Sequence, residues 1–567
     1  MEDFTNAKST GGLNLKLWRG ERMALIGMDV ADPEPDFVGF SIEVQSPGSS
    51  QFSPLRNRLN FSYDKPASQA VDGFRNFPST DAPFQKFRWL HFPYNPKGGE
   101  YTYRVTKKHM RSASGALTSG TSITLDIPLD PVVYDGFLDV GFTRNFASSQ
   151  AYVDKYGNNS KIIPSKANEG LTFKKVPGDV YEWLGFEAYQ LIFEFLKDVA
   201  ADDTLTLDVL AYDLDEPDIV GFFEKIGKRL RIVIDDSGAH KPPTSDESQA
   251  AKRLAKSAGA ANVKRMHFQS LQHNKVLIAK RNGTPIKVLL GSTNFSFRGI
   301  YIQANNALVF RAPEAAAQFE TVFNLAFSDP KSFESNPISK QWQLVHATGR
   351  PPVHFAFSPH ADFNLSLSPV GAAIDQAASS VFFSIAFLNQ DKSGPVREAI
   401  NRLMKKNVFS YGISDKTGGL QVHKPDGSVG LVDFAYLSKK APPPFKQEWA
   451  GGSGIHQHHK FVVTDFSLPT AKVISGSSNL APSGEKDNGD NLVIIDDSKV
   501  ATSYAIEALR VFDHLQFRSR MQEASSKESL DPLTLKKPKA LSKQPAWFES
   551  SYVKGSQAES DRKLFSH

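Results

Sequence analysis

An internal duplication limits how this chain can fold. Segments 273–310 and 458–495 align without a gap at a constant offset of 185, and nine of the 38 aligned positions are identical. The identities include a His, a Lys, a Ser and two Asn, whereas the apolar positions only stay apolar. Maintenance of a fold mainly preserves apolar periodicity. Identity at reactive polar positions therefore indicates two copies of one functional half-site.

Helix and strand patterns alternate from about residue 180, and the same order returns after about residue 350. The patterns predict helices over 183–200, 217–229, 246–259, 371–379 and 394–406, and strands over 204–210, 230–234, 381–388 and 408–413. Strands that alternate with helices predict sheets with crossover connections. Pro351 and Pro352 mark a junction between the two halves.

The N-terminal part differs in pattern and reads as all-β. Short apolar runs lie between turn signals at 13–18, 23–27, 38–44, 87–92, 101–105, 122–127 and 137–142. Many short strands at such spacing favour a β-sandwich, for which we expect an immunoglobulin-like arrangement. The predicted division is a β-sandwich over 1–155, α/β repeats over 156–348 and 349–527, and a C-terminal tail over 528–567. Aromatic residues in the tail leave open whether it folds back or stays loose.

Composition excludes several classes of protein. None of the 567 residues is Cys, which excludes disulfide scaffolds, Cys-ligated zinc and thiol catalysis. The formal net charge of +5 neither demands a polyanionic partner nor excludes one. The polar start MEDFTNAKST does not resemble a secretory signal, and no run of 18 apolar residues exists. We therefore expect a cytoplasmic protein with no integral membrane segment.

The polar identities fall where two consecutive strands of each half begin and end. His273 and Lys275 stand at positions i and i+2 at the start of a strand, so their side chains share a face. The next strand ends in Gly-Ser-x-Asn, which supplies Ser292 and Asn294. The second copy supplies His458, Lys460, Ser477 and Asn479. Two facing halves would place two His and two Lys around one anion.

The doubled H-x-K and G-S-x-N pattern resembles the phospholipase D superfamily, often called the HKD family. The resemblance covers roughly 180–525 and leaves the N-terminal 150 residues unexplained. In the second copy His458, Lys460 and Asp465 fit H-x-K-x-x-x-x-D, whereas the first copy has Lys280 at the aspartate position. Where the family often has a supporting Glu, the two halves have Asn305 and Asp490. We therefore expect an asymmetric active site.

The resemblance implies two phospholipase D-like α-β-α repeats in one pseudo-two-fold unit, monomeric because both half-sites are in one chain. It also implies phosphodiester cleavage through a phosphohistidine, without metal or other cofactor. His273 is then the nucleophile and His458 the general acid. The remaining expected site residues bind phosphate or support the histidines: Lys275, Lys460, Asn294, Asn479, Ser292, Ser477, Asp465, Asp490 and Asn305. We expect Asp490 to contact His458 and keep it protonated, and Asn305 to leave His273 neutral.

The motif does not name the substrate. A phospholipid headgroup is the first hypothesis, with Trp449 and segment 442–445 as an apolar approach to the site. A nuclease is the second, and it requires a basic groove; its candidates are Lys225, Lys228, Arg229, Lys264, Arg265, Lys280 and Arg281. A non-catalytic phosphate-binding module is the third. His456, His458 and His459 could instead hold a metal ion.

Overall fold

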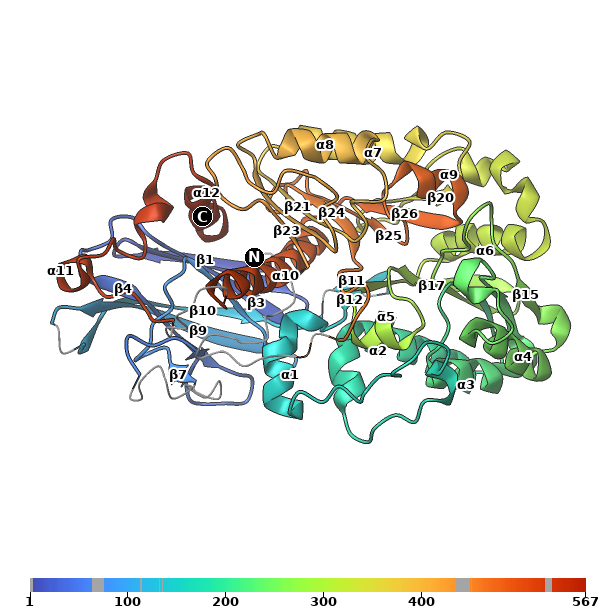
Figure 1. The fold of residues 1–567 in the computed structure, drawn as a ribbon, viewed down its shortest axis with the longest axis horizontal. Coiled ribbons are helices and arrows are strands. Elements are labelled where there is room, and N and C mark those ends of the chain that lie inside the picture. The colour runs from blue at the N-terminus through green and yellow to red at the C-terminus, as the bar shows by residue number, and fades with distance from the viewer. Residues whose placement is uncertain are drawn as a thin grey trace.

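The structure is a computed structural model that describes residues 4–63, 76–112, 115–131, 133–134, 136–434, 449, 451–525 and 533–567. It is a mixed α/β structure with two sheets of eight strands and two of four strands (Figure 1). Among the described residues, no helix has both the length and the hydropathy required to cross a membrane.

The two four-stranded sheets are antiparallel and belong to the N-terminal part. One contains β1 (Thr5–Thr10), β2 (Leu13–Gly20), β3 (Met23–Val30) and β8 (Arg88–His91). The other contains β10 (Leu117–Pro128), β9 (Glu100–Met110), β4 (Phe37–Gln45) and β5 (Ser53–Pro54), and the short β6 (Arg56–Asn57) and β7 (Phe77–Pro78) pair separately. Leu15 and Ile26 of the first sheet share one core with Phe40, Tyr103 and Val105 of the second. The immunoglobulin-like arrangement stays a prediction.

One strand expected in this part lies in another sheet. Strand β12 (Leu138–Phe142) pairs antiparallel with β18 (Asn306–Phe310) of the first α/β sheet, with Leu138 opposite Phe310, and β11 (Val133–Tyr134) extends the edge. Its assignment to the N-terminal strands was wrong. All five residues of β12 are buried, and a fully buried strand reads the same in any sheet.

The two eight-stranded sheets have equivalent strand orders, as expected from the duplication. The first runs β11-β12-β18-β17-β16-β13-β14-β15, with β13 (Leu205–Ala211), β14 (Leu230–Ile234), β15 (Val263–Arg265), β16 (Val276–Arg281) and β17 (Thr284–Gly291). The second runs β19-β20-β26-β25-β24-β21-β22-β23, with β19 (Gln343–Val345), β20 (Val353–Ser358), β21 (Ser380–Ile385), β22 (Phe409–Ser414), β23 (Leu431–Asp433), β24 (Lys460–Thr464), β25 (Lys472–Gly476) and β26 (Asp490–Ile495).

Helices cover the outer faces of both sheets. The first sheet carries α2 (Val180–Ala201), α3 (Pro217–Ile226) and α4 (Asp246–Ser257), and the second carries α7 (Asn364–Gln376) and α8 (Pro395–Leu403). Shorter helices are α1 (Ser149–Tyr156), α5 (Phe297–Tyr301), α9 (Pro482–Asp487) and α11 (Lys539–Ser542).

Helix α7 begins before its predicted start, and Pro369 lies inside it. Proline removes the hydrogen bond to the carbonyl four residues earlier. The Leu365 carbonyl instead accepts a hydrogen bond from Trp342 Nε1 at 2.9 Å. An indole from outside the helix thus replaces the lost donor.

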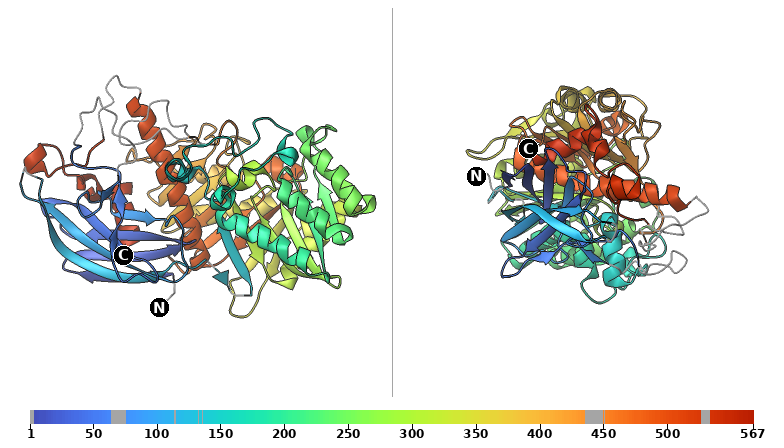
Figure 2. Two further views of the ribbon diagram at one scale, coloured as in Figure 1. Left: turned by 90° about the horizontal axis from the view of Figure 1, so that it is seen from below. Right: turned by 90° about the vertical axis from the view of Figure 1, so that its left-hand side faces the viewer.

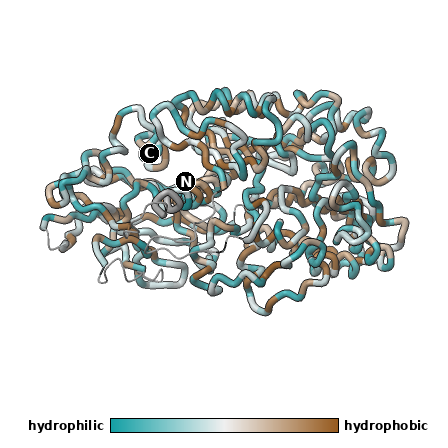
Figure 3. Tube along the Cα trace, in the orientation of Figure 1, coloured by the Kyte–Doolittle hydropathy of each residue, from teal (hydrophilic) through white to brown (hydrophobic). Residues whose placement is uncertain are grey.

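The inner faces of the two sheets meet in one continuous core. The rings of Phe310 and Phe355, one from each sheet, lie 5.3 Å apart. Helices α6 (Pro313–Ser328) and α10 (Ser498–Ser525) contribute to the same core. Figure 2 shows α10 between the N-terminal strands and the α/β unit, and Figure 3 shows many hydrophobic residues where the inner elements meet. At Gly20 of β2 a side-chain Cβ would lie 2.9 Å from the Ile506 side chain of α10, so glycine leaves room for that side chain.

The C-terminal segment folds back onto the N-terminal strands. Helix α12 (Gln557–Ser566) lies against β3, and the Trp18 indole donates a 2.8 Å hydrogen bond to the Phe565 carbonyl (Figure 1). Arg562 forms a buried ion pair with Asp29. Phe548 enters the core of the N-terminal sheets. Of the two expected arrangements of the tail, the structure shows the folded one.

Candidate active site

Backbone hydrogen bonds between the halves bring the two motif copies together. Gly489 N–H donates to the Leu271 carbonyl at 2.8 Å, and His273 N–H donates to the Gly489 carbonyl at 2.9 Å. The equivalent pair, displaced by 185 residues, joins Ala304 to His456 at 2.9 Å and His458 to Ala304 at 3.2 Å. The two catalytic candidates, His273 and His458, therefore lie in equivalent positions on either side of one interface.

Each of these histidines is held by a side chain from the opposite half. His273 Nδ1 lies 2.8 Å from Asp490 Oδ1, and His458 Nδ1 lies 2.8 Å from Asn305 Oδ1. The expected pairing, Asp490 with His458 and Asn305 with His273, is wrong. Residues 305 and 490 lie beside the interface strands, where the nearest imidazole belongs to the other half.

Burial and positive charge dominate the electrostatics of the site. His273 is 4% exposed; burial lowers its pKa, although Asp490 opposes that shift. Burial, together with Lys460 and Lys275, holds the pKa of His458 well below its usual value. Burial alone would raise the pKa of Asp490, but the contacts with His273 and Lys275 lower it. The site thus keeps one carboxylate ionised among several cationic groups.

The two lysines lie beside their histidines as the i, i+2 spacing predicts. Lys275 Nζ donates to the His273 carbonyl and lies 4.7 Å from the centre of the Tyr212 ring. Lys460 Nζ lies 3.0 Å from His458 Nε2. Burial lowers the pKa of Lys275 to about 8 and that of Lys460 well below its usual value. A bound anion would offset this cost of burying positive charge.

The two serines support other residues of the site. Ser292 Oγ donates to Asn306 Oδ1 at 2.8 Å, and Ser477 Oγ donates to Asp490 Oδ1 at 2.6 Å. Each hydroxyl proton is thus donated to a neighbouring side chain, and Ser477 thereby fixes Asp490, the partner of His273.

The two asparagines of the Gly-Ser-x-Asn motifs each have one N–H group engaged. Asn294 Nδ2 donates to Asp213 Oδ2 at 2.6 Å, and Asn479 Nδ2 donates to Gln390 Oε1 at 3.2 Å. Within the described part of the chain, neither Oδ1 atom has a hydrogen-bond partner, and both are buried. The second N–H group of each amide is available for a ligand.

Asp465 lies at the end of β24 opposite His458. Its carboxylate accepts hydrogen bonds from the backbone N–H groups of Ala378, Ser379 and Ser380, at 2.7 to 3.2 Å. Lys280 has the equivalent position in the first half, where it pairs with Asp208 at 2.7 Å. Both residues stabilise the far end of a strand, so the missing motif aspartate leaves the first half-site itself unchanged.

Two aspartates that the sequence motifs do not include orient the motif backbone. Asp235 Oδ1 accepts from Gln272 N–H at 2.7 Å, and Asp415 Oδ1 accepts from Gln457 N–H at 3.1 Å. Each follows a strand, β14 or β22, and fixes the residue before a histidine. An Asp directly after corresponding strands of both halves is the sequence signal that could have identified them.

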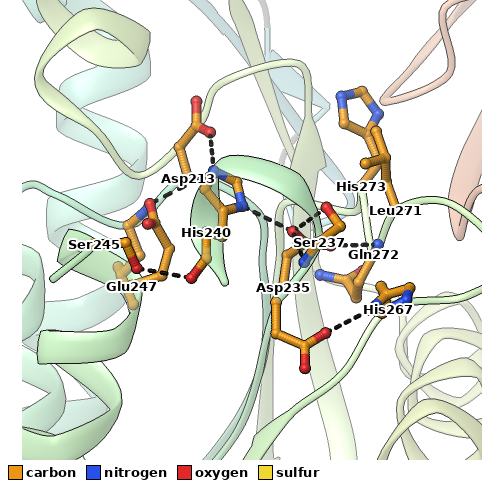
Figure 4. A network of polar contacts seen from close by, with 12 residues as sticks. Asp213, Asp235, Ser237, His240, Ser245, Glu247, His267, Leu271, Gln272 and His273 are labelled. Carbon is orange, nitrogen blue, oxygen red and sulfur yellow. Dashed lines mark hydrogen bonds and ion pairs between the residues drawn. The ribbon is translucent and has the colours of Figure 1, made fainter. Parts of the chain in front are cut away.

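A charged network specific to the first half adjoins His273 (Figure 4). His240 Nδ1 lies 2.8 Å from Asp235 Oδ2, and its Nε2 lies 3.1 Å from Asp213 Oδ1. Ligand atoms of Asp213, His240 and Glu247 lie within 4.8 Å of one another, a spacing that a metal ion could use. Although burial opposes it, the contacts with Asp213 and Asp235 raise the pKa of His240 to about 10. A protonated imidazole thus supplies the positive charge among these carboxylates.

The other candidate metal group does not converge. His456 stacks on Phe434, with ring centres 4.1 Å apart. His459 lies 5.1 Å from the Phe461 ring and 3.8 Å from Glu507. His458 faces Asn305. The three neighbouring histidines therefore point to different surroundings.

Most of the residues expected to form a basic groove lie away from the site. Strand β16 follows the motif at its start and has Lys280 and Arg281 at its other end. Strand β14 is preceded by Lys225, Lys228 and Arg229, and Asp235 follows its other end. Of the expected apolar approach, the structure describes only Trp449. Trp449 is half-buried against Tyr152, with ring centres 6.0 Å apart. Segment 442–445 lies outside the described residues.

Residues 217–326 match the family model described as cardiolipin synthase, PLD-like domain. This segment contains His273, Lys275, Ser292, Asn294 and Asn305. By this match, residues 217–326 form a phospholipase D-like domain. No curated protein sequence is significantly similar to the chain as a whole.

Several solved structures are similar to parts of the chain at low identity. A phosphatidylserine synthase from Haemophilus influenzae is 12% identical over 66% of this chain and 93% of its own, with a TM-score of 0.41. The phospholipase D family member Nuc from Salmonella typhimurium is 25% identical over 24% of this chain and 84% of its own, with a TM-score of 0.20. A polyphosphate kinase from Porphyromonas gingivalis is 10% identical over 62% of this chain, with a TM-score of 0.39, and the match spans only 54% of the kinase.

Proposed function

We propose that the protein hydrolyses a phosphodiester through a phosphohistidine formed on His273. The observation that supports this best is the crossed support of the two histidines. Each imidazole has Nδ1 engaged by the opposite half, at 2.8 Å in both cases, so Nε2 is the nitrogen that would meet a reacting group, and Lys460 Nζ lies 3.0 Å from that of His458. Such fixed orientation is what nucleophilic and acid-base catalysis require.

In the first step His273 Nε2 attacks phosphorus, and the bond from phosphorus to the leaving oxygen breaks. His458 donates its Nε2 proton to that oxygen, so that an alcohol leaves. Positive charge develops on the His273 ring, and the carboxylate of Asp490 stabilises it. This replaces the role that we first expected for Asp490. The asymmetry favours His273 as nucleophile because the carboxylate lies on the ring that becomes cationic.

In the second step a water molecule gives a proton to His458 and attacks phosphorus. The bond between phosphorus and Nε2 breaks, which releases a phosphomonoester and neutral His273. Acid function in the first step requires protonated His458, whose pKa is low when the site is empty. A bound phosphodiester anion would raise the pKa of His458 directly. It would also raise this pKa by offsetting the positive charges of Lys275 and Lys460.

For the substrate we propose a phospholipid with a small headgroup alcohol. The reacting histidines are only 4% and 5% exposed, which suits a narrow approach to the phosphate. A nucleic-acid substrate requires several phosphate contacts along a basic groove, and five of the seven basic candidates lie at the opposite end of the sheet. The N-terminal strands would serve in substrate recognition or packing.

The test is to incubate the protein separately with phosphatidylcholine vesicles and single-stranded DNA, each with EDTA, and to measure choline and nucleotides. We expect choline release with EDTA present, and none from His273→Ala. Release of nucleotides alone would assign the nuclease function instead. No product from either, with the fold intact by circular dichroism, would favour a phosphate-binding module.

A further inference from the structure

A second cavity lies where the N-terminal strands meet the α/β unit. Its volume is about 370 Å³, within the range of about 300–1,000 Å³ for small-molecule sites. Residues of both parts line it, among them Trp89, Tyr94, Arg144, Trp183 and Arg510. None of the histidines and lysines of the candidate active site belongs to its lining.

The lining is basic. Five basic side chains face one acidic side chain: Arg58, Lys86, Arg88, Arg144 and Arg510 against Asp513. Carboxylates pair with three of the arginines, namely Arg58 with Asp154, Arg88 with Asp513 and Arg510 with Glu507. Lys86 and Arg144 have no carboxylate within ion-pair distance in the described part of the chain. The lining thus carries more positive than negative charge, and Lys86 and Arg144 are the basic groups outside its ion pairs.

Arg144 is the most unusual of these groups because it is 3% exposed. Its guanidinium donates to the Trp183 carbonyl at 3.0 Å and lies between the rings of Phe92 and Trp183, at 4.2 and 4.4 Å. Burial, together with Arg510, lowers the pKa of Arg144 to about 9. Burying a charge without an ionic partner is costly, so an anion here would stabilise the protein.

One donor in the lining lacks an acceptor among the described residues. Trp183 is 5% exposed, and its Nε1–H group has no hydrogen-bond partner among the described residues. Buried N–H groups are seldom left unpaired. A ligand oxygen would satisfy the indole of Trp183 and the charge of Arg144 together, while the neighbouring rings offer an aromatic surface to a planar group.

The wall of the cavity is linked to the candidate active site by consecutive hydrogen bonds. Arg510 donates to the Thr143 carbonyl at 3.2 Å, and Thr143 Oγ1 accepts from Asn305 N–H at 3.0 Å. Asn305 in turn holds His458 at 2.8 Å. A ligand that moves Arg510 would therefore act on the support of His458.

We propose that this cavity is a regulatory site for a small organic phosphate with a planar ring, such as a nucleoside monophosphate. The phosphate would lie against Arg144 and Lys86, and the ring against the tryptophans. The regulatory part rests on the proposed function, whereas the binding part does not.

Calorimetric titration of the full chain with AMP, adenosine and inorganic phosphate tests the binding part. We expect AMP to bind more tightly than either component. Trp183→Phe keeps the ring and removes the N–H donor, and Lys86→Glu reverses an exposed charge at the cavity; each should raise the Kd for AMP at least tenfold. Lys256→Glu, an exposed control on α4, should leave it unchanged.

Two further measurements separate this cavity from the active site. His273→Asn should retain AMP binding. If this variant loses AMP binding, the ligand lies at the active site and the proposal is overturned. The proposal is also overturned if the wild type does not bind AMP, or if it binds inorganic phosphate as tightly as AMP. The rate of phosphodiester hydrolysis should change on AMP saturation in the wild type and not in Trp183→Phe. An unchanged wild-type rate overturns the regulatory part, whereas no hydrolysis at all concerns the proposed function.

Discussion

The two half-sites share a strand order and a backbone arrangement but differ in the group behind each imidazole. The first histidine faces a carboxylate, Asp490, and the second an amide, Asn305. The distances are the same, so the duplication preserved the geometry while the charge diverged. One charged atom pair therefore distinguishes two positions that the fold makes equivalent, and in the proposed mechanism this pair divides nucleophile from acid.

The largest expected effect separates the two histidines directly. His273→Ala should lower kcat by roughly 10³-fold or more for every substrate, because no nucleophile remains. His458→Ala should lower it as much for an alkyl phosphodiester, whereas the first-turnover release of p-nitrophenol from a p-nitrophenyl ester should fall far less, because that leaving group needs no proton. Single-turnover rates with both substrates measure this. If the p-nitrophenyl ester restores the rate of His273→Ala instead of that of His458→Ala, then His458 is the nucleophile and His273 the acid.

Removing the carboxylate should have the next largest effect. Asp490→Asn should lower kcat by about 10²-fold, because charge on His273 in the transition state loses its stabilisation. The contact with Asp490 raises the pKa of His273, so its loss should move the acid limb of the kcat/KM profile to lower pH.

Exchange of the two supports tests the same comparison. The double variant Asp490→Asn with Asn305→Asp places the carboxylate on His458. We expect phosphorus label from a trapped intermediate to appear on His458 in this variant, and on His273 in the wild type. Label that stays on His273 in both would show that charge does not divide the roles.

The His240 network belongs to the first half and should contribute stability that depends on pH. The folded-state pKa of His240, about 10, lies above the unfolded value of about 6.5. Its contribution is then fully present below pH 6.5 and is lost as pH rises through about 10. Denaturant titrations at pH 6 to 10 measure the difference in free energy of unfolding between the wild type and His240→Asn. We expect this difference to shrink as the pH rises. A constant difference would contradict a protonated His240.

The smallest catalytic effect is expected far from the site. Asp465→Asn should lower the free energy of unfolding by about 1–3 kcal/mol, because buried backbone donors lose a charged acceptor. We expect kcat to change less than about twofold, since the carboxylate lies at the other end of β24. A large loss of kcat in a variant that remains folded would return Asp465 to the active site.

Periodicity and the duplication predicted the alternating elements and the location of the motifs, because strand ends and motif spacing are local properties. Pairing across the interface could not be predicted in this way. Asn305 and Asp490 meet the histidine of the other half only because the strands of the two sheets adjoin there. Strand β12 was misplaced for the same reason, since burial on both faces does not name its neighbour. The buried charge of Arg144 depends on surroundings from three parts of the chain, and nothing local to residue 144 indicates it.

The docking of α12 has a consequence for synthesis. The N-terminal strands leave the ribosome first, yet their core includes Phe548, and Asp29 pairs with Arg562. Those strands therefore cannot complete their packing until more than 500 further residues have been translated. We expect this part of the chain to close last although it is made first, so that the end of translation and the end of folding coincide.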